Sequence, residues 1–173
     1  MKLLVDTREQ SPLEFVATDG VEIEVRSLPV GDYQAEGQAC VVERKSIPDL
    51  FGSFSSNYEA ERNKMIRAKE NKLKYILAIE ESATEVRKGH TYWKNGQQHE
   101  SAKTGISQMR QLMTISRKYG VEVWFCAGRK DMAFRIMEYF LAGDRLPSTT
   151  TAFGGEKIDG PLIEQIDTPT TKD

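Results

Sequence analysis

Residues 31–49, GDYQAEGQACVVERKSIPD, decide how this chain folds and where its charged side chains meet. The stretch predicts a short hairpin, with Asp32 where the first strand begins and an apolar second strand that turns abruptly into charge at Glu43. Successive side chains of a strand point to opposite faces, so Glu43 and Lys45 share one face and Arg44 takes the other. We therefore expect two carboxylates and one ammonium group to lie on a single rigid surface.

Two acids and a lysine in one place are the minimal equipment for metal-assisted hydrolysis of a phosphodiester. The reaction needs a nucleophilic water, neutralisation of the charge on the phosphoryl oxygens and help for the leaving alkoxide. Mg²⁺ supplies much of this and prefers carboxylate oxygens, which Asp32 and Glu43 would provide. Lys45 would orient the water or steady the phosphate. Asp6, at the end of a predicted strand, is a third candidate metal ligand.

The order of these residues is Gly31-Asp32, then Glu43-Arg44-Lys45 with Asp49, and Asp6-Thr7-Arg8-Glu9 lies upstream. In this order they resemble the signature of the XPF/Hef-type structure-specific DNA endonucleases. The resemblance covers residues 2–143. It implies a restriction-endonuclease-like α/β fold, in which helices flank a mixed central sheet.

The resemblance also implies roles for individual residues. Asp32 and Glu43 would be metal ligands, Asp6 would lie beside the metal and Lys45 would be catalytic. Four further residues would support catalysis: Arg8, Glu9, Arg44 and Asp49. The cofactor would be Mg²⁺ or Mn²⁺, the substrate would be DNA with a branch or a single-strand/double-strand junction, and the setting would be DNA repair or recombination.

Larger members of that family carry a tandem helix-hairpin-helix domain after the nuclease, and some carry a helicase before it. This sequence shows neither and looks like the compact standalone versions of bacteriophages. Family members commonly dimerise through their nuclease domains. The last expected helix, residues 129–143, is apolar around most of its circumference, which indicates deep burial or a covering partner. One stripe of this helix consists of six apolar residues: Met132, Ala133, Ile136, Met137, Phe140 and Leu141. We therefore expect a homodimer through this helix.

Single residues of the signature also have ordinary structural interpretations. Ser46-Ile47-Pro48-Asp49 fits a helix-capping box, so a local role for Asp49 stays open beside a catalytic one. Asp32 after a glycine fits a turn, and Arg8 and Glu9 fit a local ion pair. Taken together, and with Lys45, these residues favour a functional site.

The composition predicts one core rather than two, since 39% of the 173 residues are hydrophobic and 29% are charged. We expect a nuclease domain over residues 1–143 and a flexible tail over residues 144–173, where Ser, Thr, Pro and Gly are frequent. No apolar run approaches the ~20 residues of a membrane helix, and no signal peptide is evident. Cys40 and Cys126 have apolar neighbours and are expected to be buried thiols, in a reducing, cytoplasmic setting.

The net charge of −2 does not by itself indicate a protein that binds nucleic acid. The charges are unevenly spread, however. Residues 51–120 hold thirteen Lys and Arg against seven Asp and Glu, a local +6, whereas residues 1–50 hold five against ten, a local −5. Lys64 and Arg67 belong to a basic row that suits phosphates and equally suits a solvated helix face. A basic surface beside an acidic metal site is what contact with a DNA backbone would use.

The apolar pattern alternates between strands and helices. We expect strands near residues 2–6, 21–28, 33–36, 39–45, 74–80 and 121–126. We expect helices near residues 47–54, 57–72, 103–119 and 129–143. Residues 82–101 read as a long polar connection. The third helix has an expected core-facing stripe of six residues: Ile106, Met109, Leu112, Met113, Ser116 and Tyr119.

The sequence thus predicts a metal-dependent DNA endonuclease, a phosphodiester hydrolase. Two alternatives stay open. One is a non-catalytic DNA-binding or scaffolding subunit of a nuclease complex, and the other is a metal-dependent nuclease that acts on RNA or on simple duplex DNA. The intact set of Asp32, Glu43 and Lys45 argues against the first alternative, because a subunit released from catalysis has no need for it.

Overall fold

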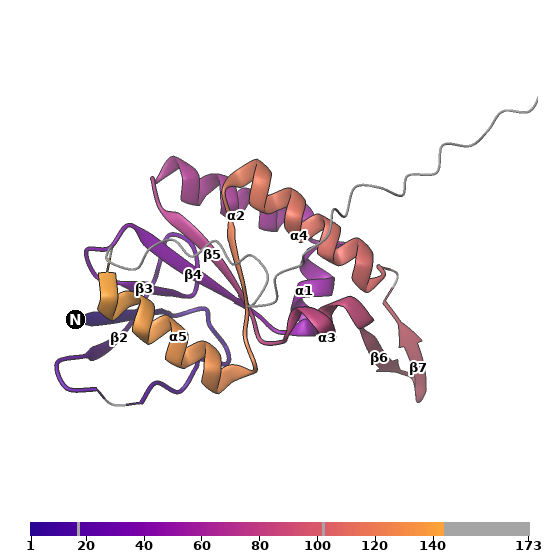
Figure 1. The fold of residues 1–173 in the computed structure, drawn as a ribbon, viewed down its shortest axis with the longest axis horizontal. Coiled ribbons are helices and arrows are strands. Elements are labelled where there is room, and N and C mark those ends of the chain that lie inside the picture. Colours follow the sequence, from indigo (N-terminus) through magenta and orange to yellow (C-terminus); the bar gives the residue numbers. More distant parts are fainter. Residues whose placement is uncertain (17, 102, 144–173) are drawn as a thin grey trace, which may run out of the picture.

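A six-stranded sheet forms the centre of the computed structural model, which describes residues 1–16, 18–101 and 103–143 (Figure 1). Its strands lie in the order β2-β1-β3-β4-β5-β8. Their bounds are β1 Lys2–Asp6, β2 Glu22–Arg26, β3 Tyr33–Ala35, β4 Cys40–Lys45, β5 Lys74–Ile79 and β8 Glu122–Phe125. β1 and β2 run parallel, β3 is antiparallel to both β1 and β4, and β4, β5 and β8 are parallel. The sheet is therefore mixed, which confirms the expected fold class.

Helices cover both faces of this sheet. Their bounds are α1 Ile47–Ser53, α2 Tyr58–Glu70, α3 Ala83–Lys88, α4 Gly105–Tyr119 and α5 Arg129–Ala142. Figure 1 shows α2 and α4 together on one side of the strands and α5 on the other. One apolar core packs α1, α2 and α4 against Val41 and Leu77, and the second packs α5 against Val42 and Ile76. The alternation of β4 thus sends consecutive side chains into different layers.

The turn before β3 depends on Gly31, whose φ of +80° is a left-handed conformation that other residues adopt only with strain. A Cβ at this position would lie 3.0 Å from the Cβ of Val41 and 3.3 Å from the carbonyl oxygen of Val42. This close approach accompanies two hydrogen bonds of 2.8 Å, from the Asp32 N–H to the Val42 carbonyl and from the Asp6 N–H to the Asp32 carbonyl. Gly31 therefore helps to bring β1, β3 and β4 together at the end where their acids lie.

Residues 82–101, which the sequence reads as a polar connection, contain three elements that we did not predict. They are α3 and a two-stranded antiparallel hairpin, β6 Thr91–Lys94 and β7 Gln97–Glu100, which extends away from the sheet in Figure 1. Ser82 begins α3 by accepting a hydrogen bond from the Glu85 N–H. Asn95 and Gly96 both have positive φ at the hairpin turn. An Asn-Gly pair is a strong hairpin signal, so this element was recognisable from the sequence.

The expected stripe of α4 is partly wrong. Ile106 is 57% exposed, whereas Gln108 and Ile115, which the stripe omits, are fully buried. The reason is the contact between α4 and the unexpected α3. A Cβ on Gly105 would lie 2.2 Å from a carbonyl oxygen of α3, so the two helices meet almost backbone to backbone there. That contact turns the Gln108 side of the helix inward.

α5 buries one side and exposes the other. Met132, Ile136 and Phe140 are buried against the sheet, as the stripe predicts. Leu141, which we expected in the same stripe, is 50% exposed, and Phe134 is 61% exposed. The two side chains leave apolar surface on the outer side of α5.

Other sequence expectations have mixed outcomes. Cys40 and Cys126 are buried and form no disulfide, as predicted. Among the described residues, no helix combines the length and the apolar composition needed to cross a membrane. The expected tail, residues 144–173, lies outside the described residues, so the domain boundary stays a prediction.

We expect Gly31→Ala to lower the free energy of unfolding by about 2–4 kcal/mol, because the methyl group adds a contact with Val41 to the strain of a positive φ. Gly37→Ala is the matched control, since Gly37 has the same φ of +80° and nothing within 4 Å of its added Cβ. Urea unfolding of both variants measures the difference. Equal losses would show that the contact at Gly31 carries no cost of its own.

Candidate active site

Asp32, Glu43 and Lys45 come together at the end of β4. Glu43 and Lys45 point to the α2 side of the sheet, and their side chains form an ion pair of 3.0 Å. Both are buried, with side chains 4% and 8% exposed. The carboxylate of Asp32 accepts a 2.8 Å hydrogen bond from the backbone N–H of Arg44, which fixes it beside Glu43. The structure thus brings together the three residues that the sequence singles out first.

α2 adds two charged side chains that close a ring over β4. Lys45 Nζ lies 2.9 Å from Glu61 Oε1, and Lys64 Nζ lies 3.3 Å from the same oxygen. Lys64 Nζ also lies 2.6 Å from Glu43 Oε1. We call Glu43, Lys45, Glu61 and Lys64 the charge ring. Three of its side chains are at most 8% exposed, whereas Lys64 is 38% exposed and forms its outer member.

Asp32 lies next to this ring and forms no direct ion pair among the described residues, although the charge of Lys64 acts on it. Burial and the neighbouring Glu43 carboxylate raise the pKa of Asp32 from 3.8 to about 7, although the Arg44 N–H opposes the shift. Two carboxylates held close together in a partly dry site repel each other, so one of them retains its proton more strongly. The site therefore carries an excess of negative potential at Asp32.

Asp6 lies at the end of β1 but is engaged by other partners. Its carboxylate accepts hydrogen bonds from Nε and Nη2 of Arg8, at 2.9 and 2.5 Å, and from the backbone N–H groups of Arg8 and Leu28, at 2.7 and 3.1 Å. These bonds, the Arg8 side chain first, hold the pKa of Asp6 below its ordinary value despite burial. Arg8 is 63% exposed on its side chain. The negative charges of Asp32 and Glu43 contribute to the raised pKa of its guanidinium after Asp6 itself. Arg8 therefore borders the site on the β1 side.

Arg44 and Glu9 belong to a second charge network on the opposite face of β4. The Arg44 guanidinium donates to both carboxylate oxygens of Glu9, each at 3.0 Å, and to Glu80 at 2.9 Å. Glu80 also pairs with Arg129 at 2.8 Å, and Arg129 donates to the carbonyl oxygen of Pro12. This network ties the segment after β1 to β4, β5 and α5. Arg8 and Glu9 therefore do not form the local ion pair that the sequence left open, because each has a different partner.

Asp49 takes the local role that the capping pattern predicts. Ser46 begins α1 and accepts a hydrogen bond from the Asp49 N–H at 3.3 Å, and its hydroxyl donates to the Asp49 carboxylate at 2.6 Å. The Asp49 side chain is exposed. The capping interpretation is thus confirmed, and a catalytic role for Asp49 stays a prediction.

The donor set fits a hard divalent cation through two residues rather than three. Within the described residues, no group of three His, Cys, Asp or Glu side chains is placed to hold a metal ion, so the expected convergence of three acids is not observed. The reason is that Arg8 and backbone amides occupy the Asp6 carboxylate. Asp32 and Glu43 remain, and their mutual repulsion is what a cation would relieve. Mg²⁺ commonly binds proteins through one or two carboxylates and keeps its remaining waters.

Tyr75 of β5 adds a buried hydroxyl group at the same place. Its hydroxyl is buried and has no well-formed hydrogen bond among the described residues. Burial, followed by the negative charges of Glu43, Glu61 and Asp32, raises the pKa of Tyr75 well above its ordinary value. The hydroxyl of Tyr75 therefore lies within the field of the acids at the site.

Sequence reasoning did not assign Glu61, Lys64 and Tyr75 to the site. It predicted Lys64 only as part of a basic row and gave the other two no role. A weak signal was present, because Glu61 and Lys64 stand three residues apart on a helix and so share a face. Tyr75 lies opposite Val41 in the register of β4 and β5, which a single strand does not reveal.

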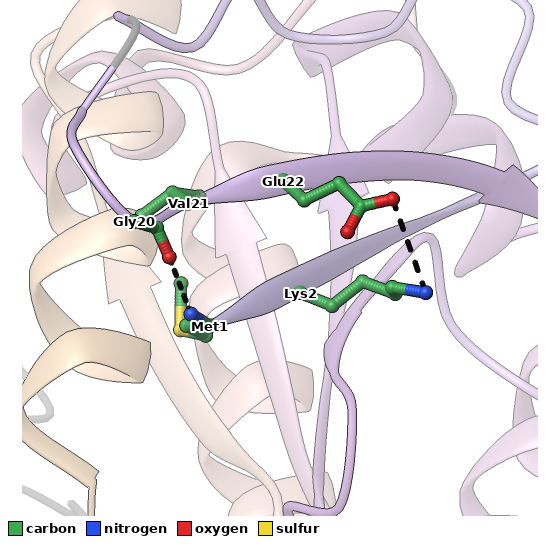
Figure 2. A pocket seen from close by; sticks show the side chains of 5 residues that line it. All are labelled: Met1, Lys2, Gly20, Val21 and Glu22. Atoms are coloured by element: carbon green, nitrogen blue, oxygen red, sulfur yellow. Dashed lines mark hydrogen bonds and ion pairs between the residues drawn. The ribbon is translucent and has the colours of Figure 1, made fainter.

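A surface pocket of about 430 Å³ lies away from these residues, at the start of β1 and β2 (Figure 2). It is lined by Met1, Lys2, Gly20, Val21 and Glu22. Figure 2 shows that its polar groups satisfy one another, through the bond from the Met1 amino group to the Gly20 carbonyl and the 3.9 Å ion pair between Lys2 and Glu22. None of the candidate site residues lines it.

Comparisons with known proteins bear on the family and the fold. The ERCC4 domain matches residues 5–137. XPF from Aeropyrum pernix has a similar structure, with a TM-score of 0.57 and 18% identity, over 80% of this chain and 62% of that chain. XPF from Aeropyrum pernix in complex with DNA matches with a TM-score of 0.55 and 20% identity, over 79% and 62% of the two chains. This chain thus corresponds to less than two thirds of those proteins, and the likeness confirms the fold. A comparison with curated proteins finds no match.

We expect the metal-free protein to lose stability as the pH rises from about 4 to about 7. The pKa of Asp32 is higher in the folded protein, about 7, than its ordinary value of 3.8. The protonated carboxyl therefore stabilises the fold at low pH, and this contribution is lost as the pH rises through the folded pKa. Asp32→Asn should remove this loss. The free energy of unfolding of the variant should therefore rise by about 2 kcal/mol relative to that of wild type as the pH goes from 5 to 8.

Urea unfolding in EDTA at several pH values measures this difference. Asp19→Asn, which removes an exposed carboxylate elsewhere, is the control and should keep the wild-type pH dependence. Parallel curves for wild type and Asp32→Asn would contradict the expectation.

Proposed function

The chain belongs to the ERCC4 domain family, and we propose that it is a metal-dependent endonuclease that hydrolyses DNA phosphodiesters near branches or single-strand/double-strand junctions. The observation that carries the proposal is the grouping of Asp32, Glu43 and Lys45 on one surface, where the half-buried Asp32 carboxylate has a raised pKa beside Glu43 and the Lys45 ammonium group contacts Glu43. A merely structural ion pair needs no second carboxylate with a raised pKa beside it.

In this proposal Asp32 and Glu43 hold Mg²⁺ or Mn²⁺. The bound ion would supply charge neutralisation at the scissile phosphate and a water of lowered pKa. The Arg44 N–H keeps Asp32 in position, and Glu61 holds Lys45 so that its ammonium group stays at the acid pair. Lys45 would orient the attacking water or steady a phosphoryl oxygen. Asp6 would act indirectly, by holding the guanidinium of Arg8 at the exposed edge of the site.

DNA as the substrate is supported by charge and by family. Residues 51–120, which include α2, carry a local +6 beside the acidic site. Lys64 and Arg8 are exposed enough at the rim to reach a phosphate backbone. One of the similar structures is XPF from Aeropyrum pernix in complex with DNA. The preference for branched or junction-containing DNA rests on the family resemblance.

A non-catalytic subunit that binds DNA, or a nuclease for RNA or simple duplex DNA, would also fit the fold. The first alternative is disfavoured because the acid pair costs stability and has no use in a scaffold. The second differs from the proposal only in substrate, so a panel of nucleic acids separates them.

We expect wild-type protein with Mg²⁺ or Mn²⁺ to cut a flap or splayed DNA in preference to plain duplex, single strands and RNA. Asp32→Asn and Lys45→Ala should each lower the rate by a factor of about 10² or more, because they remove charge stabilisation at the reacting phosphate. Asp19→Asn, which removes an exposed carboxylate elsewhere, should leave the rate unchanged. Circular dichroism checks that the variants fold. Normal cutting by both site variants would assign the activity elsewhere.

We also propose that two copies associate through the outer side of α5, as the sequence predicts. Phe134→Glu should then convert a dimer into a monomer, because a charge replaces a side chain that is 61% exposed and apolar. Gel filtration at micromolar concentration measures the mass. Ile106→Glu is the control, since Ile106 is 57% exposed on α4 and should not affect association. A monomeric wild-type protein would exclude this interface.

A further inference from the structure

The outer member of the charge ring occupies an unusual place. Lys64 Nζ lies 2.6 Å from Glu43 Oε1, closer to that oxygen than Lys45, whose ammonium group lies 3.0 Å away. Glu43 is 4% exposed on its side chain, so two cations neutralise one buried carboxylate. Asp32 contributes to the raised pKa of Lys64, after Glu43 and Glu61 and against the effect of burial. Lys64 therefore lies within the field of the whole acid pair.

Lys64 has freedom of movement that the other members of the ring lack. Its side chain is 38% exposed, whereas those of Glu43, Lys45 and Glu61 are at most 8% exposed. A second acceptor is within reach, because Glu61 stands one turn earlier on α2 and lies 3.3 Å from Lys64 Nζ. Lys64 can therefore leave Glu43 and keep an ion pair with Glu61, without a change in the backbone of the helix.

We propose that Lys64 is the resident counter-ion of the Asp32–Glu43 acid pair, and that it leaves Glu43 for Glu61 when a divalent cation binds. The inference rests on the proposed metal-dependent function and names a role for a residue outside the family signature. Lys64 stabilises the metal-free site, because the buried Glu43 and the half-buried Asp32 repel each other when no cation lies between them. It also competes with the metal, since its ammonium group must give up a 2.6 Å contact with a metal ligand.

Lys64→Met should therefore have two effects of opposite sign. The melting temperature in EDTA should fall by a few degrees, because the acid pair loses a counter-ion. Mn²⁺ should bind about tenfold more tightly, because a competing cation is gone. Calorimetry or electron paramagnetic resonance without DNA measures the dissociation constant. Lys69→Met is the matched control. It removes the same charge from the same helix, at an exposed residue without an ion pair among the described residues, and should change neither quantity.

A double-mutant cycle tests the exchange itself. Glu61→Gln removes the acceptor to which Lys64 retreats, so it should weaken Mn²⁺ binding. In the Lys64→Met background the same substitution should weaken Mn²⁺ binding clearly less, because no Lys64 ammonium group then has to move to Glu61. If Lys64→Met does not fold, Lys64→Gln takes its place and is expected to behave alike.

The outcomes separate the inference from the proposed function. Mn²⁺ binding of equal strength by wild type and Lys64→Met would overturn the role of Lys64 and leave the nuclease proposal intact. Equal effects of Glu61→Gln in both backgrounds would overturn the exchange with Glu61. A wild-type protein that binds no Mn²⁺ would overturn the metal part of the proposed function and this inference with it.

Discussion

The structure depends on one electrostatic constraint, the repulsion between Asp32 and Glu43 at the end of a buried strand. Burial makes this repulsion stronger than it would be in water, and the pKa of Asp32 is raised first by burial and then by the Glu43 charge. The neighbouring cations partly offset this repulsion. Lys45 and Lys64 contact Glu43, and Arg8 lies within the field of both acids while it binds Asp6. A site arranged in this way is less stable without a further cation, which is the physical case for a metal.

The side chains of β4 alternate between the two faces of the sheet, and this alternation separates the charge ring from the network that holds neighbouring segments together. Glu43 and Lys45 join the charge ring under α2, whereas Arg44, between them in the sequence, points to the opposite layer. There it binds Glu9 and Glu80, which in turn hold the segment after β1 and the beginning of α5. Three consecutive charged residues thus serve two separate networks. A slip of the strand register by one residue would exchange the networks and destroy both.

The part of the site that could be predicted from sequence is the part that local rules govern. Strand alternation placed Glu43 and Lys45 together, and helix capping explained Asp49. The partners of these residues could not be predicted, because they depend on packing between distant segments. Glu61 reaches Lys45 only because α2 packs on the face of the sheet that Lys45 shares, and Glu9 meets Arg44 across 35 positions of sequence. Ile106 was misplaced for a similar reason, since its orientation follows from the close contact of α4 with an unexpected helix.

Arg44 connects the two networks through different parts of one residue. Its backbone N–H fixes the Asp32 carboxylate, and its guanidinium clamps Glu9 and Glu80 on the far side of the sheet. Most residues at this position would supply the same N–H, so the arginine side chain is not needed to orient Asp32. Its contribution is to hold the segment after β1, which also carries Arg8. The guanidinium of Arg44 is therefore a positioning group, which binds Glu9 and Glu80 on the face of β4 opposite to Glu43 and so holds the segment that carries Arg8.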